Sequence, residues 1–117
     1  MNIRILKNDS EIYILELHGI IDLYGSARIK ELVMKLIERK IERLILDLKD
    51  VGRINSTGVA ALVYISSTLK KLNYGLVITN ANRFVQKEME VTKLSRLLPI
   101  VPTLKEAVKS FSYPAGS

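Results

Sequence analysis

The chain has 117 residues, of which 48% are hydrophobic and 26% are charged, which is the composition of one ordinary globular domain. It contains no cysteine, and this excludes disulfide bonds, a thiolate nucleophile and a cysteine-ligated metal. The formal net charge is +6, but the basic residues are scattered among acids and the aromatic residues are few. This pattern disfavours nucleic-acid binding and favours a hydrated charged surface or an acidic protein partner.

The first residues alternate between apolar and polar side chains, and no apolar run in the chain approaches the length that spans a bilayer. The start of the chain also lacks the apolar segment of a signal peptide. The sequence therefore predicts a cytoplasmic protein with no membrane insertion.

Two strands are predicted first, over residues 2–7 and 11–18, where apolar and polar residues alternate. Gly19 is expected to end the second strand. A helix is predicted over residues 26–39, because one apolar stripe is formed there by Ile29, Leu32, Val33, Leu36 and Ile37. The apolar run at residues 44–48 indicates a central strand that is buried on both faces.

Turn-forming residues dominate residues 49–58, which are predicted to form a loop that leads into a helix over residues 58–72. A buried strand is expected over residues 76–78 and a short helix over residues 83–91. Residues 97–101 are predicted as an edge strand, because the prolines there disfavour a place inside the sheet.

The last predicted element is a helix capped by Thr103. Strands that alternate with helices indicate parallel neighbours in a sheet. The predicted fold class is therefore α/β, a single domain with a mixed β-sheet of four to five strands and about four helices. The domain is expected to cover residues 1–112, and residues 113–117 are expected to form a flexible tail.

The segment that leads into the helix at residue 58 carries the most chemistry. Asn55, Ser56 and Thr57 can each cap a helix that follows them. A hydroxyl at this place can also accept a phosphate, which the free N–H groups and positive end of the helix would stabilise. A phosphate adds a charge of about −1.5 to −2, enough to disrupt a partner surface. The residues alone leave both interpretations open.

Other kinds of site find little support in the sequence. His18 is the single histidine, and nothing at metal-ligand spacing accompanies it, so no metal site is predicted. The interval from Gly52 to Gly58 lacks the Lys-Ser/Thr pair of a phosphate-binding loop. The Gly-x-Ser-x-Gly turn of serine hydrolases is also missing. No enzyme activity and no cofactor are therefore predicted, which disfavours a small hydrolase or nucleotide-binding protein.

Three features together resemble the STAS domain, and most closely the bacterial anti-sigma-factor antagonists. They are the strand that ends in Asp47-Leu48, the Ile-Asn-Ser-Thr-Gly step at residues 54–58, and the Gly-x-x-Asp motif at residues 19–22. The likeness runs from about residue 5 to residue 110. In this family the hydroxyl residue just before the glycine is phosphorylated by a cognate anti-sigma kinase.

Carried over, the resemblance implies that Thr57 is the phosphoacceptor, with Ser56 as the neighbour that can substitute. The Asp of the Gly-x-x-Asp motif, Asp22 here, lies near the phosphoacceptor in the family. The implied partner-binding surface consists of Asp22, Arg53, Asn55, Ser56, Thr57 and Gly58.

The function implied by the resemblance is a switch in transcription regulation. The unphosphorylated protein binds an anti-sigma factor that has serine/threonine kinase activity, and a sigma factor is released. Phosphorylation ends the binding, and a phosphatase resets the switch.

Asn55 stands where the family has an aspartate, so a second interpretation stays open. It is a STAS binding module that is never phosphorylated and belongs to a stress-signalling or lipid-transport assembly. A STAS domain of an anion transporter is a further alternative.

Overall fold

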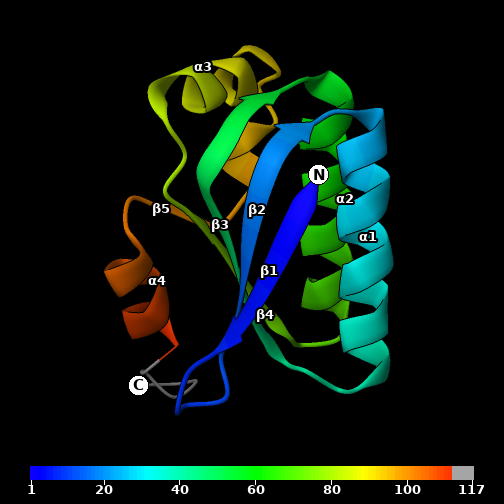
Figure 1. The fold of residues 1–117 in the computed structure, drawn as a ribbon, viewed down its shortest axis with the longest axis vertical. Coiled ribbons are helices and arrows are strands. Elements are labelled where there is room, and N and C mark those ends of the chain that lie inside the picture. Colours follow the sequence, from blue (N-terminus) through cyan, green and yellow to red (C-terminus); the bar gives the residue numbers. More distant parts are fainter. Residues whose placement is uncertain (112–117) are drawn as a thin grey trace.

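The computed structural model describes residues 1–111, and they form a single domain built on one five-stranded sheet (Figure 1). The predicted tail at residues 113–117 lies outside the described residues. In chain order the elements are β1 (Asn2–Lys7), β2 (Tyr13–Ile21), α1 (Leu23–Glu38), β3 (Arg43–Ile54), α2 (Ser56–Lys71), β4 (Gly75–Thr79), α3 (Arg83–Val91), the short 3₁₀ helix η1 (Ser95–Leu97), β5 (Ile100–Val101) and α4 (Leu104–Ser110). The predicted α/β class and mixed sheet are confirmed.

The strands lie in the sheet in the same order as in the chain. β1 pairs antiparallel with β2, whereas β2, β3, β4 and β5 are all parallel to one another. Because every parallel neighbour is reached through a helix, the helices of the described chain begin at the carboxyl edge of the sheet. α1 and α2 lie side by side on one face, α4 lies on the other, and α3 sits at the carboxyl edge (Figure 1).

The core has two layers, and β3 contributes to both. Leu44, Leu46 and Leu48 face the larger cluster, under α1 and α2, whereas Ile45 belongs to the smaller cluster, under α4. Successive side chains of a strand point to opposite faces, so burial on both sides requires a nearly continuous apolar run, which here is interrupted by the buried Asp47 alone. This confirms the buried central strand that the sequence predicted at residues 44–48.

Two strand ends differ from the sequence prediction. β2 continues to Ile21 and β3 to Ile54, so most of the predicted loop is strand. Gly19 does not end β2; it lies within the strand at a φ of 128°, next to shifts in the β2–β3 register. An irregularity of this kind bends a strand without ending it, and pairing with β3 then holds both strands in place.

Two boundaries move for local reasons. α1 begins at Leu23, three residues before the predicted start, because Asp22 caps it. The last strand is shorter than predicted, since residues 95–97 form the 3₁₀ helix. The predicted cap of the last helix is confirmed, with the Thr103 hydroxyl accepting a hydrogen bond from the amide of Glu106. Within residues 1–111, no helix combines the length and apolar character needed to cross a bilayer.

Candidate functional site

The start of α2 is held by a single side chain, Asn55. Its Oδ1 atom accepts a hydrogen bond of 2.9 Å from the backbone N–H of Gly58. The backbone N–H of Asn55 in turn donates to the carbonyl oxygen of Ile21, at 3.3 Å. Ser56 and Thr57 are therefore the first two residues of the helix rather than its caps, and both are exposed. Of the three predicted cap candidates, Asn55 alone has that role.

The start of α1 lies beside the start of α2 and has the same geometry. The Oδ1 atom of Asp22 accepts a hydrogen bond of 2.9 Å from the backbone N–H of Gly25. Ile21 and Ile54, the residues that precede the two caps, are paired in the sheet. The chain thus places Asp22 and Asn55 at the ends of neighbouring strands.

The two glycines are required by close packing against β2. A Cβ atom on Gly58 would collide with the carbonyl oxygen of Ile21, and one on Gly25 would collide with that of Ile20. Each helix start therefore lies directly on the strand backbone. Gly58 is buried, so it shapes the site from below while the two hydroxyl residues before it face outward.

Arg53 lies at the same edge, in β3, two residues before the cap. Its side chain is exposed and forms an ion pair with Glu88 of α3, with 3.6 Å between Nε and Oε1. Phe84, which is 75% exposed, lines the same hollow as this pair. An exposed pair of this kind contributes little to stability. Arg53 is therefore available to a partner or to a nearby anion.

Two asparagines fix α3 against β3. Asn80 donates a hydrogen bond of 3.1 Å to the buried carboxylate of Asp47, and Asn82 donates one of 2.9 Å to the carbonyl of Val51. Asn82 also caps α3 by accepting from the amide of Val85. These bonds hold the helix that carries Glu88 and Phe84, two residues of the edge that the sequence did not single out.

A second charged group lies on the sheet face rather than at the helix starts. The Lys49 ammonium donates to Glu16 at 3.2 Å, and Arg4 pairs with the same carboxylate at 3.7 Å. The pKa of Lys49 is raised above its ordinary value by the hydrogen bond to Glu16 and by attraction to Glu16, Asp47 and Asp50. Lys49 is thus held as a cation by neighbours outside the candidate site.

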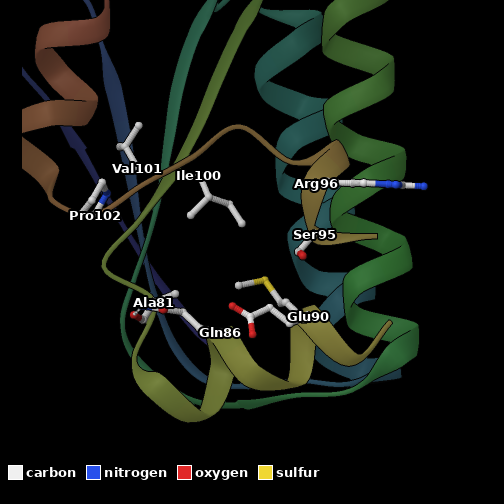
Figure 2. Close-up of a pocket in the computed structure, with 9 residues that line it drawn as sticks. Ala81, Gln86, Glu90, Ser95, Arg96, Ile100, Val101 and Pro102 are labelled. Carbon is white, nitrogen blue, oxygen red and sulfur yellow. Dashed lines mark hydrogen bonds between the residues drawn. The ribbon is translucent and has the colours of Figure 1, made fainter. Parts of the chain in front are cut away.

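A separate cleft lies between α3, η1 and β5 (Figure 2). It has a volume of about 460 Å³ and is lined by Ala81, Gln86, Met89, Glu90, Ser95, Arg96, Ile100, Val101 and Pro102. In Figure 2 the side chain of Arg96 extends away from Ile100 and the centre of the cleft. None of the site residues predicted from the sequence lines this cleft.

His18 is exposed on β2. Within residues 1–111 no group of three or more His, Asp or Glu side chains could hold a metal ion.

Comparison with known proteins gives the family. The model of the STAS domain matches residues 4–107. A crystal structure of a Thermotoga maritima protein described as an anti-sigma factor antagonist superposes with a TM-score of 0.85 at 20% identity, covering 95% of each chain. An anti-sigma factor antagonist of Mycobacterium paratuberculosis gives 0.83 at 19% identity, covering 96% of this chain and 94% of the other.

The Bacillus protein SpoIIAA is similar to this chain in both its unphosphorylated and its phosphorylated form. Its unphosphorylated form gives a TM-score of 0.78 at 16% identity, covering 95% of this chain and 96% of the other. Its phosphorylated form gives a TM-score of 0.70 at 15% identity, covering 94% of this chain and 99% of the other. At these identities the structures establish the fold, and the domain model establishes the family: this chain belongs to the STAS domain family.

Proposed function

We propose that this chain is an anti-sigma-factor antagonist. In its unphosphorylated form it binds an anti-sigma factor with serine/threonine kinase activity, and this releases a sigma factor in the cytoplasm. Phosphorylation of Thr57, or of Ser56, ends the binding, and a phosphatase restores it. The chain supplies the hydroxyl and the docking surface, while the kinase performs the phosphate transfer.

One observation carries the proposal: Thr57 is exposed at the second position of α2, while Asn55 alone makes the cap. A hydroxyl that is not used to hold the helix can be modified without loss of the cap. A phosphate there lies near backbone N–H groups that have no partner within the helix and near its positive end. The existence of SpoIIAA in phosphorylated and unphosphorylated forms supports a switch on this fold.

The proposed docking surface consists of the starts of α1 and α2 together with Arg53, near the end of β3. The adjoining ends of β2 and β3 carry Asp22, Asn55, Ser56 and Thr57. Arg53 is exposed beside them. Gly58 contributes by its small size, because it is buried under the hydroxyl residues.

A phosphotransfer assay tests the proposal. The tagged chain is used to isolate its partner from the source cell, and the purified partner is incubated with the chain and ATP. Mass spectrometry is expected to place one phosphate on Thr57, and on Ser56 to a smaller extent. The Thr57→Ala variant is expected to lose most of the modification. A partner that hydrolyses ATP but leaves the chain unmodified would contradict the switch.

The second candidate function is a STAS binding module that is not phosphorylated, as part of a stress-signalling or lipid-transport assembly. Asn55 favours it, because a neutral amide replaces the carboxylate that the family has beside the acceptor. The same assay distinguishes the two functions. A stable complex with a partner that lacks kinase activity would support the second.

A further inference from the structure

A groove of about 540 Å³ runs between the N-terminal halves of α1 and α2. It is lined mostly by apolar atoms, from Leu23, Ser26, Ala27, Lys30, Thr57, Ala60, Ala61 and Tyr64. Leu23 and Tyr64 are 61% and 54% exposed, so large apolar surface is open to solvent at both helices. Exposed apolar surface of this kind is typical of interaction sites. Because Thr57 lines the groove, the groove is continuous with the proposed phosphorylation site.

Ser26 gives an independent sign of an occupant. The residue is 4% exposed, and its Oγ atom has no hydrogen-bond partner among residues 1–111. Buried polar groups are nearly always hydrogen-bonded, since an unsatisfied one costs free energy. Ser26 also lines the groove, and a change of its rotamer would be needed to bring the buried Oγ atom within reach of a polar group of a bound molecule.

The charged groups around the groove indicate which sign of charge a bound molecule should carry. Among the lining residues Lys30 is the one with a charged side chain, and its ammonium lies 4.8 Å from the centroid of the Tyr64 ring. α2 contains no acidic residue, and the first acid of α1, Glu31, pairs with Lys35 at 3.4 Å. Both helices direct their positive ends to this edge; the Asp22 carboxylate offsets that of α1, while that of α2 carries no acid. The groove therefore favours an apolar molecule that carries negative charge.

We propose that this groove binds an acidic amphipathic segment of the protein partner. Apolar side chains of the segment fill the space over Ala27 and Ala60, a carboxylate pairs with Lys30, and a polar group bonds to Ser26. A phosphate on Thr57 places negative charge at the end of the same groove and so repels the segment while the fold stays intact. The inference rests on the proposed function for the identity of the partner, but the preference for acidic segments does not.

Two synthetic peptides test this preference without any kinase. Both are amphipathic helices with leucines on one face; one has glutamates along its flanks and the other has lysines at the same positions. Each is titrated into the full chain labelled with ¹⁵N, and the amide chemical shifts are followed. The glutamate peptide is expected to shift the amides of Ala27, Ala60 and Tyr64. It is also expected to bind about fivefold more tightly than the lysine peptide, because Lys30 attracts the first and repels the second and each exposed charge interaction is worth about twofold.

Charge reversal provides the matched control. Lys30→Glu is expected to lower the affinity for the glutamate peptide and to raise the affinity for the lysine peptide, each by about fivefold. Lys70→Glu makes the same change of charge at the far end of α2, outside the groove, and is expected to alter neither affinity by more than about twofold.

Several results would overturn the proposal. Equal binding of the two peptides would remove the charge preference, and shifts confined to the cleft between α3 and β5 would place the site elsewhere. Concentration-dependent shifts without peptide would assign the groove to a second copy of the chain. Tighter binding to phosphatidylglycerol vesicles than to the glutamate peptide would assign it to a membrane. If the glutamate peptide binds more tightly and no phosphate is found on Thr57, the proposed binding groove is supported and the proposed phosphorylation switch is contradicted.

Discussion

The two helix starts at the carboxyl edge share one geometry and differ in chemistry. At α1 the chain reads Asp22-Leu-Tyr-Gly25 and at α2 it reads Asn55-Ser-Thr-Gly58. In both, the Oδ1 atom of the first residue accepts a hydrogen bond of 2.9 Å from the backbone N–H of the glycine. The glycine also lies against a backbone carbonyl of β2. The comparison teaches that the cap and the glycine determine the geometry, while the two residues between them are free to determine function.

The cap itself also differs in a way that matters for anions. Asp22 brings a negative charge to the positive end of α1, whereas Asn55 caps α2 without any charge. The first turn of α2 contains no acid either. The positive end of α2 is therefore uncompensated and would stabilise a phosphate once it is attached to Thr57, whereas the missing carboxylate bears on how readily a kinase attaches it.

Removing either glycine is expected to have the largest effect. Gly58→Ala drives a methyl group into the carbonyl of Ile21 and should lower the free energy of unfolding by about 3 kcal/mol. Gly25→Ala should act in the same way through Ile20. Urea denaturation measures both. Gly52→Ala is the control, because a Cβ atom there meets nothing within 4 Å. If Gly58→Ala is as mild as Gly52→Ala, Gly58 does not pack closely against the carbonyl of Ile21.

Removing a cap is expected to have the next largest effect. Asp22→Ala and Asn55→Ala should each lower the free energy of unfolding by about 1 kcal/mol, because each leaves a helix N–H without its acceptor. Asp22→Ala should cost more, since it also removes a charge that the helix end favours. Thermal melting at low ionic strength compares the two variants. A larger loss for Asn55→Ala would contradict the assigned difference between the caps.

Exchanging the charge of the caps is expected to have the smallest effect on stability. Asn55→Asp should raise the free energy of unfolding by about 0.3–1 kcal/mol, and Asp22→Asn should lower it by a similar amount. Added salt should reduce both changes. Opposite signs for the two variants, measured by urea denaturation with and without salt, are the expected result. No change in either variant would show that the caps act through geometry alone.

The sequence predicted those elements whose pattern is local. The apolar stripe from Ile29 to Ile37 and the buried run at residues 44–48 both correspond to elements of the structure. The end of β3 could not be predicted in this way, because Lys49, Asp50 and Gly52 are poor strand formers. They are in a strand because β2 continues beside them, which is a tertiary effect.

The candidate site was predictable only in part. The position before Gly58 drew attention to Thr57, and the resemblance to the STAS family joined it to Asp22, which lies at the neighbouring strand end. Lys30 and Tyr64 were not identified, although they line the same groove as Thr57. Which faces of two helices meet depends on how both pack on the sheet, and the periodicity of each helix alone does not determine it.

The central claim is that negative charge at Thr57 ends partner binding while the fold persists. Its most direct test compares Thr57→Glu with Thr57→Ala in thermal melting and in affinity for the partner. A carboxylate in the first turn of α2 should preserve or slightly raise the melting temperature, because the helix end is positive. Thr57→Glu should lose much of the binding, though less than a phosphate would remove, since it carries less charge. Thr57→Ala should keep the binding. Equal affinity in the two variants, with both melts preserved, would contradict the account.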